Sequence, residues 1–209
     1  MSELSIVSYN CRGLNDISKR QKLFSWFECE KFDVILLQET FCTQQSEKMF
    51  KSGWKGLSLF ANSDSSHSRG VAILFRPNFD IEIISKYTSD DGRIAIVNAN
   101  FRNNFFSFVS VYSPNIESER VTFFENIQHI LFNNVTNPDR VIVGGDFNCC
   151  LNVSDRFPVS TRPDKSVQYL VNLLKNCNLV DSWSNINPGK PGCTYFHKKV
   201  TLTVDWTIS

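Results

Sequence analysis

The stretch Val141-Ile142-Val143-Gly144-Gly145-Asp146-Phe147-Asn148 is the most informative part of this chain for its fold. Its three apolar residues predict a buried strand. The two glycines remove Cβ bulk and permit positive φ, so we expect a sharp turn that a ligand can approach closely. Residues two apart on extended backbone point to the same side, so Asp146 and Asn148 would present a carboxylate and a carboxamide together. Such a pair suits a hydrated metal or a phosphate oxygen, although an ordinary strand-end turn explains the same residues equally well.

Two other predicted strands also end in polar side chains. Residues 4–10 end in Tyr9-Asn10, and the apolar run at residues 34–37 is followed by Gln38-Glu39. A rigid sheet fixes the geometry of whatever follows its strands, which is why strand ends often carry sites. If the three ends meet, they form an oxygen-rich set that suits Mg²⁺ better than zinc. Tyr112, at the end of a further strand, would add a phenol.

Composition predicts one domain, residues 1–209, with a core filled by aromatic rings. Hydrophobic residues make up 42% of the chain, and 18 phenylalanines stand against 2 methionines. The formal net charge of +1 gives no global attraction to a polyanion, so nucleic acid would have to bind at a local basic patch. Seven cysteines without a Cys-x-x-Cys pair predict reduced thiols and no structural zinc. Without a secretory signal or a long apolar stretch, we expect a nuclear or cytoplasmic monomer that does not enter a membrane.

The hydrophobic periodicity predicts a mixed α/β (α+β) domain: a sandwich of two sheets with helices on its outer faces. Helical spacing is found at residues 17–32, 117–132 and 166–176. The last of these helices would bury Val167, Leu170, Val171 and Leu174, and Lys19, Arg20 and Lys22 would lie on the exposed face of the first. Strands are predicted at residues 4–10, 34–37, 57–60, 71–75, 81–84, 94–101, 105–112 and 141–143, with two short ones near Tyr195 and Val204.

Four segments together resemble the exonuclease–endonuclease–phosphatase superfamily (the DNase I-like fold), most of all the apurinic-type endonuclease domain of non-LTR, LINE-type retrotransposons. They are Ser8-Tyr9-Asn10-Cys11-Arg12-Gly13-Leu14, Leu36-Leu37-Gln38-Glu39-Thr40, Val111-Tyr112-Ser113-Pro114 and Gly144-Gly145-Asp146-Phe147-Asn148. Looser matches follow in the same order at residues 179–183, 188, 194–196 and 204–206. The resemblance implies a four-layer αββα sandwich of two mixed sheets. It also implies an enzyme that hydrolyses phosphodiesters with Mg²⁺ or Mn²⁺.

The resemblance also implies roles for individual residues. By this resemblance Glu39 would be the principal metal ligand. Asn10 would orient the phosphate or complete the metal shell. Asp146 would orient or deprotonate the attacking water, and Asn148 would hydrogen-bond that water or the scissile phosphate. Tyr112 would contact a phosphate oxygen. Arg156 and Thr194 correspond to residues that face DNA in the retrotransposon branch.

Two departures from the family pattern bear on activity. Arg12 stands where the repair enzymes of the superfamily have an acid, and the retrotransposon branch lacks that acid too. The family closes with an Asp-His pair on a last strand, held by an upstream aspartate that Asp205 matches. His67, His129 and His197 lie elsewhere in the sequence, and no histidine follows Asp205. We therefore expect the last catalytic strand to be missing and the domain to be incomplete at its C-terminal end.

Three functions remain open from the sequence. The first is a Mg²⁺-dependent endonuclease that nicks DNA, with a reverse transcriptase domain as its partner in the intact polyprotein. The second is a catalytically inactive remnant of that domain, which the absent histidine favours. The third is a phosphoesterase of the same fold with a substrate other than DNA, because fold alone does not determine function.

Overall fold

The computed structural model describes residues 4–152, 155, 163–190, 192 and 206–208. Contacts along the chain divide it into two compact units. The sheet unit comprises Met1–Tyr112, Val135–Asp146 and Thr203–Ser209, and the helical unit comprises Ser113–Asn134 and Phe147–Leu202. Whether the two units make one domain, as the composition suggests, stays a prediction.

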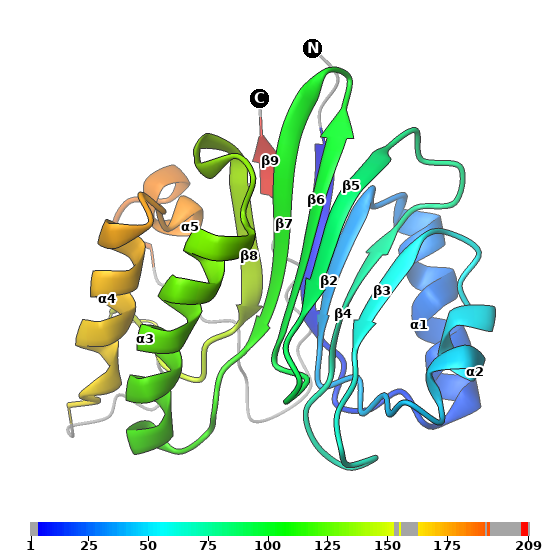
Figure 1. Ribbon diagram of the computed structural model, residues 1–209, viewed down its shortest axis with the longest axis horizontal. Helices are drawn as coiled ribbons and strands as arrows, with labels where there is room; N and C mark the ends of the chain where they lie inside the picture. The colour runs from blue at the N-terminus through cyan, green and yellow to red at the C-terminus, as the bar shows by residue number, and fades with distance from the viewer. Residues whose placement is uncertain (1–3, 153–154, 156–162, 191, 193–205, 209) are drawn as a thin grey trace. The chain divides into compact units, whose positions relative to one another are not determined.

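The sheet unit contains two mixed sheets (Figure 1). The first has the order β3-β4-β2-β1-β9, in which only β1 and β2 run parallel. The second has the order β5-β6-β7-β8, in which only β7 and β8 run parallel. The strands are β1 (Leu4–Asn10), β2 (Val34–Gln38), β3 (Ser58–Ala61), β4 (Val71–Phe75), β5 (Glu82–Thr88), β6 (Ile94–Phe101), β7 (Asn104–Tyr112), β8 (Val141–Asp146) and β9 (Trp206–Ile208).

One core lies between the two sheets, and the period-two alternation of the strands supplies it. It contains, among others, Leu4, Ile6, Val34, Leu36, Val71, Ile73, Ala95, Val97, Phe108 and Tyr112. The opposite face of the first sheet forms a second core with α1 (Ile17–Glu30) and α2 (Glu47–Ser52), which lie along that face in Figure 1. Its rings include Phe24, Phe27, Phe50 and Trp54.

Arg20 corrects the expectation of an exposed basic face on α1. Its side chain is only 4% exposed. The guanidinium donates to the Leu14 carbonyl at 2.6 Å and lies 4.8 Å from the centre of the Phe50 ring. The buried charge is thus satisfied by a loop carbonyl and an aromatic face. Leu14 lies outside the helix and Phe50 is remote in sequence, so helical periodicity alone assigned Arg20 to the wrong face.

The two glycines of β8 serve close packing and make no turn. Gly144 and Gly145 lie inside the strand and neither has positive φ. A Cβ atom on Gly144 would lie 2.6 Å from Leu36 Cδ1 of the facing sheet, and one on Gly145 would lie 2.2 Å from the Val111 carbonyl oxygen. The expectation of a sharp turn was therefore wrong, because what approaches these glycines is the protein itself.

Strands β6 and β7 form a hairpin, and β7 begins at Asn104, one residue before its predicted start. Arg102 and Asn103 occupy the two-residue turn with φ of 51° and 62°. Positive φ at both positions matches the strand twist in the way that tight hairpin turns require.

The helical unit contains α3 (Glu117–Asn134), α4 (Ser166–Asn176) and α5 (Ser182–Ile186). Helices α3 and α4 pack side by side (Figure 1). Helix α4 has the predicted bounds but buries Leu170 and Leu173, whereas Val171 is 42% exposed. None of the helices in the described part of the chain is long and apolar enough to cross a membrane.

Strand β9 pairs antiparallel with β1, from Ile208 opposite Leu4 to Trp206 opposite Ile6. The strand expected near Val204 is described at Trp206–Ile208, and the strand expected near Tyr195 lies outside the described residues. The predicted absence of a further, catalytic strand stays a prediction.

A Gly145→Ala substitution tests the packing of β8. Because the new methyl group meets a backbone carbonyl that cannot rotate away, we expect the free energy of unfolding to fall by about 1–3 kcal/mol. Urea denaturation of the native chain and the variant measures this difference in the free energy of unfolding. Gly53→Ala is the matched control, since Gly53 has φ of −81° and a Cβ atom there meets nothing closer than 3.4 Å. Equal stability of the two variants would contradict the packing argument.

Candidate active site

One carboxamide joins the ends of three strands in the sheet unit. Asn10 is the last residue of β1, Glu39 follows β2 directly, and Asp146 is the last residue of β8. Asn10 Nδ2 donates to Glu39 Oε1 at 2.9 Å and to Asp146 Oδ2 at 2.9 Å. Asn10 Oδ1 accepts from the Arg12 backbone N–H at 3.1 Å, which fixes the orientation of the amide. The structure therefore brings together three of the residues that the sequence predicted.

The backbone of Glu39 is held in an unusual conformation. Its φ is 52°, in the left-handed region that costs a non-glycine residue roughly 1–2 kcal/mol. The Glu39 carbonyl accepts from the Gly13 N–H at 2.7 Å, and the next N–H, of Thr40, donates to the Gly70 carbonyl at 2.9 Å. Hydrogen bonds on both sides thus maintain a strained residue, a feature that is frequent at functional sites.

A buried polar layer lies next to Asn10 and Glu39 and connects the two sheets. Gln38 is 1% exposed, and its Nε2 lies 3.2 Å from Ser8 Oγ, 3.0 Å from the Leu36 carbonyl and 3.3 Å from Ser110 Oγ. Ser110 Oγ donates in turn to the Leu37 carbonyl at 3.0 Å. Because β1 and β2 belong to one sheet and Ser110 to the other, this layer fixes the separation of the strands that carry the acids. The sign of this role in the sequence is that Gln38 stands two residues after Leu36, on the same face of β2.

Tyr112 lies at the end of β7, in register with Asp146 of β8. Its side chain is 6% exposed and belongs to the core between the sheets. The Arg93 guanidinium lies 5.4 Å from the centre of its ring, and Arg93 Nη1 donates to the Tyr112 carbonyl at 3.2 Å. Partners in register project to the same face of a sheet, so Tyr112 and Asp146 share the inner face. A contact between its hydroxyl and phosphate stays a prediction.

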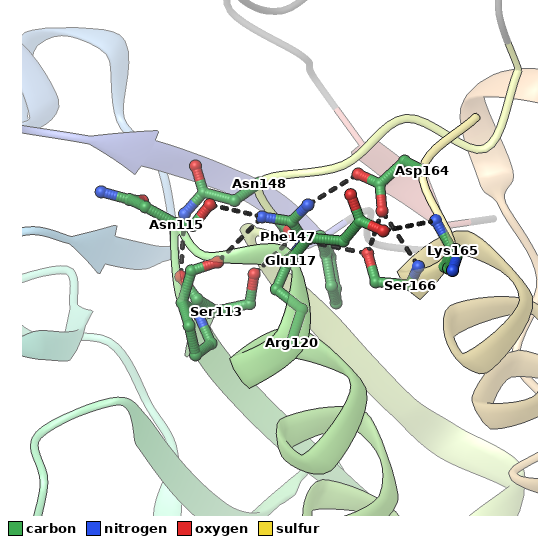
Figure 2. A network of polar contacts seen from close by, with 10 residues as sticks. Ser113, Asn115, Glu117, Arg120, Phe147, Asn148, Asp164, Lys165 and Ser166 are labelled. Carbon is green, nitrogen blue, oxygen red and sulfur yellow. Dashed lines mark hydrogen bonds and ion pairs between the residues drawn. The ribbon is translucent and has the colours of Figure 1, made fainter. Parts of the chain in front are cut away.

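Asn148 belongs to the helical unit and has a defined setting there. Its φ is 51°, and its Nδ2 donates to the Ser113 carbonyl at 2.8 Å. The Ser113 hydroxyl donates to the Phe147 carbonyl. Figure 2 shows this pair of segments beside Arg120. Arg156, Thr194 and Asp205 lie outside the described residues.

Arg120 organises the segments around Ser113 (Figure 2). It is 5% exposed, and its Nη2 bonds Asp164 Oδ2 at 2.7 Å. Its Nη1 donates to the Asn115 carbonyl at 2.7 Å, and its Nε donates to Ser166 Oγ at 2.9 Å. Burial raises the pKa of Asp164, but hydrogen bonds from Ser166 and the charge of Arg120 outweigh that effect and hold the pKa below its usual value.

The chemistry of the donor set fits a cation that prefers oxygen. Glu39 and Asp146 converge on one amide, and Mg²⁺ in proteins is usually held by one or two carboxylates together with substrate phosphates. Within the described residues there is no group of three or more His, Cys, Asp and Glu side chains that could hold a metal. Glu39 is the acid that would hold such an ion, and Asp146 lies on the other side of the Asn10 amide. Asn10 turns its N–H groups toward them, so its own role as a ligand stays a prediction.

Three cysteine thiols have a raised pKa. Burial raises the pKa of Cys11, whose thiol donates to the Gln38 carbonyl at 3.0 Å. Burial likewise raises the pKa of Cys42 and of Cys149 to about 12. A protonated thiol is a poor nucleophile. Cys11 is thus a packing residue next to Asn10.

The two histidines within the described residues are surface residues. His67 lies in the loop before β4 and His129 on α3, and both are exposed. His197 lies outside the described residues.

Comparison with known proteins identifies the family. Residues 7–208 match the endonuclease/exonuclease/phosphatase family over nearly the whole chain. The chain belongs to this family. The sequence resemblance to this family assigned Asn10, Glu39 and Asp146 to one site. In the structure the Asn10 side chain donates a hydrogen bond to each of the two acids.

The chain is similar to a transposon protein. It is 30% identical over 192 residues to the "Transposon TX1 uncharacterized 149 kDa protein" of Xenopus laevis. The match covers 92% of this chain but 14% of that protein, so the chain spans a small part of its relative's length.

Two solved structures have the same fold as this chain. The AP endonuclease LMAP from Leishmania major superposes with a TM-score of 0.72 at 14% identity, over 89% of this chain and 70% of that one. The endonuclease domain of TRAS1, a telomere-specific non-LTR retrotransposon, superposes with a TM-score of 0.62 at 18% identity, over 84% and 73% of the two chains. These likenesses confirm the predicted fold class of two mixed sheets flanked by helices.

An Asn10→Ala substitution tests the bridging amide. It leaves two half-buried carboxylates without their common donor, so we expect the free energy of unfolding to fall by about 1–2 kcal/mol. Asn100→Ala is the matched control, since the Asn100 amide donates to a single exposed acid, Glu82, at 3.3 Å and its loss should change stability by less than about 0.5 kcal/mol. Urea denaturation at neutral pH compares them, and an equal loss in both would show that Asn10 is not a bridge.

An Asp164→Asn substitution tests the network around Arg120. Removing one partner of a buried ion pair costs about 3–5 kcal/mol, so the variant should be markedly less stable at pH 7. Because the pKa of Asp164 is lowered in the folded state, its contribution is present above the ordinary aspartate pKa of about 3.9 and is lost as pH falls through the folded value. The stability difference between the two proteins should therefore shrink in acid. A difference that is constant from pH 7 to pH 3 would contradict this assignment.

Proposed function

We propose that this chain is the DNA endonuclease domain of a retrotransposon, which nicks DNA by metal-dependent hydrolysis of a phosphodiester bond. The observation that carries the proposal is the contact of Asn10 with both Glu39 and Asp146 at the ends of strands from two sheets. The likeness to the transposon TX1 protein supports a transposon origin, and the fold shared with the TRAS1 endonuclease domain supports a retrotransposon. In the intact product we expect a reverse transcriptase domain as the partner.

The arrangement divides the chemistry between two acids. Glu39, in its strained backbone, would hold Mg²⁺ or Mn²⁺, which when bound supplies charge stabilisation to the phosphate oxygens. Asp146 would orient the attacking water and accept its proton. Asn10 keeps the two carboxylates in fixed positions through its two N–H donors, so that neither acid must reorganise during the reaction.

Tyr112 and Asn148 would contribute further hydrogen bonds. The family resemblance assigns Tyr112 to a phosphate oxygen and Asn148 to the water or the scissile phosphate. Both are rigidly held, Tyr112 by its burial at the end of β7 and Asn148 by the Ser113 carbonyl. Rigid donors are the kind that stabilise charge developing in a transition state.

Nicking of a supercoiled plasmid tests the proposal. With Mg²⁺ present we expect conversion to the open circle, and EDTA should abolish it. Asp146→Asn should lower the rate by about 10²-fold or more, because the acid that accepts the proton is gone. Asp139→Asn is the matched control, since Asp139 lies just before β8, at the opposite end of the strand from Asp146.

Two further arms separate the alternatives. A chain extended by a family-like Asp-His strand is assayed beside the 209-residue chain; if only the extended chain nicks, the domain is an endonuclease that is inactive in the present form. Phosphate release from small phosphate esters is measured in parallel, and release without nicking would favour a phosphoesterase. Nicking that is unaffected by Asp146→Asn would show that the site is wrong.

A further inference from the structure

Two Arg-Gly pairs, Arg12-Gly13 and Arg69-Gly70, lie on either side of the segment that begins at Glu39. The Gly13 N–H donates to the Glu39 carbonyl at 2.7 Å on one side. On the other side the Phe41 N–H donates to the Arg69 carbonyl at 2.9 Å. The predicted metal ligand is thus flanked by two cationic loops of the sheet unit.

The two pairs share an uncommon backbone. The φ values are 48° and 85° in Arg12-Gly13 and 60° and 81° in Arg69-Gly70. The glycines are explained by packing. A Cβ atom on Gly13 would lie 2.6 Å from the Phe41 ring, and one on Gly70 would lie 2.5 Å from Thr40 Oγ1.

The arginines are not explained in the same way. The left-handed region favours Gly, Asn and Asp, whereas a long side chain there is disfavoured by roughly 1–2 kcal/mol. Neither turn geometry nor burial selects arginine, since Arg12 is exposed and Arg69 is half-buried. Observed strain of this kind, repeated beside a candidate catalytic acid, indicates a function for the side chains.

Both loops are fixed in place. The Arg12 N–H donates to Asn10 Oδ1 at 3.1 Å, and Lys19 Nζ donates to the Arg12 carbonyl at 2.8 Å. Asn15 Nδ2 donates to the Ser66 carbonyl at 2.6 Å and so ties the first loop to the second. Arg69 Nη1 reaches the Asp91 carbonyl at 3.4 Å. A ligand held by these arginines would therefore meet preorganised loops.

Electrostatics indicates what that ligand is. Glu39 and Asp146 place two carboxylates where a phosphodiester must approach, and like charges repel. Arginines in the loops on both sides of the segment that begins at Glu39 would compensate that repulsion, and arginine binds phosphate oxygens in a bidentate manner. A substrate with a single phosphate needs one such contact, whereas a polynucleotide offers a phosphate at each side.

We propose that Arg12 and Arg69 bind the backbone phosphates that flank the cleaved bond, so that the site selects a nucleic-acid strand over a small phosphate ester. This inference rests on the proposed function. Such contacts position the strand and carry no sequence information. They also supply a local positive field to a chain whose net charge is only +1.

Arg12→Asn and Arg69→Asn test the inference, because asparagine removes the charge and still favours the left-handed backbone. Binding of a fluorescein-labelled DNA duplex is followed by anisotropy as a function of NaCl, with Ca²⁺ in place of Mg²⁺ to prevent turnover. Each substitution should weaken binding several-fold and reduce the slope of log K against log salt by about one. Thermal melting should show stability unchanged or raised.

Lys31→Asn is the matched control. Lys31 also has positive φ, 59°, and is exposed, but it caps the C-terminal end of α1 and precedes β2, at the opposite end of that strand from Glu39. We expect Lys31→Asn, like the two arginine variants, to leave thermal stability unchanged or raised, but the slope of log K against log salt should stay that of the native chain. An equal loss of binding in all three variants would show a non-specific charge effect and overturn the inference.

The outcomes of this test and of the nicking assay are independent. Nicking with unchanged salt slopes in both arginine variants would overturn the inference and leave the proposed function standing. Reduced slopes without nicking would support the phosphate contacts and contradict the hydrolytic role of this chain. If either variant melts at a lower temperature, Arg12→Lys and Arg69→Lys, which keep the charge, must retain the slope of the native chain; a lower slope overturns the inference.

Discussion

The architecture of the candidate site depends on one carboxamide that holds two anions. Asn10 is suited to this because a primary amide carries two N–H donors on one nitrogen, so a single side chain can bind Glu39 and Asp146 at once. A carboxylate in its place could not donate, and a hydroxyl could donate only once. The close approach of β8 at Gly144 and the Gln38–Ser110 contact bring the strand ends within reach of this group.

The inner face of the sheets changes character along the strands, and that change creates the site. In β1 and β2 the inward positions pass from Ile6 and Leu36, which are apolar, to Ser8 and Gln38, and then to Asn10. Each step is more polar than the one before and lies nearer the end of the strand. The acids are therefore supported by buried hydrogen-bonding groups rather than by apolar rings, and such groups hold their partners in defined directions.

Much of this could be predicted from the sequence, since apolar runs and period-two alternation locate strands and their ends. Strands β1, β4 and β6 and helix α4 have the predicted bounds, and Asn10, Glu39 and Asp146 meet as expected. Helices α2 and α5 were missed because 6 and 5 residues are too few to show a helical period. The glycines of β8 and the burial of Arg20 were misjudged because their causes, Leu36 and Phe50, are distant in sequence and become neighbours only in the folded chain.

The hydrogen bond between Asn10 and Asp146 spans 136 positions of the sequence. Contacts between residues so far apart in sequence form late in folding. The chain loses the entropy of closing a long loop before such a contact contributes any stability. During synthesis β1 leaves the ribosome before β8, and the acid partner on β8 is made more than a hundred residues after Asn10. A nascent or partly folded chain therefore has no assembled site, and any cutting activity would begin only when the second sheet has closed against the first.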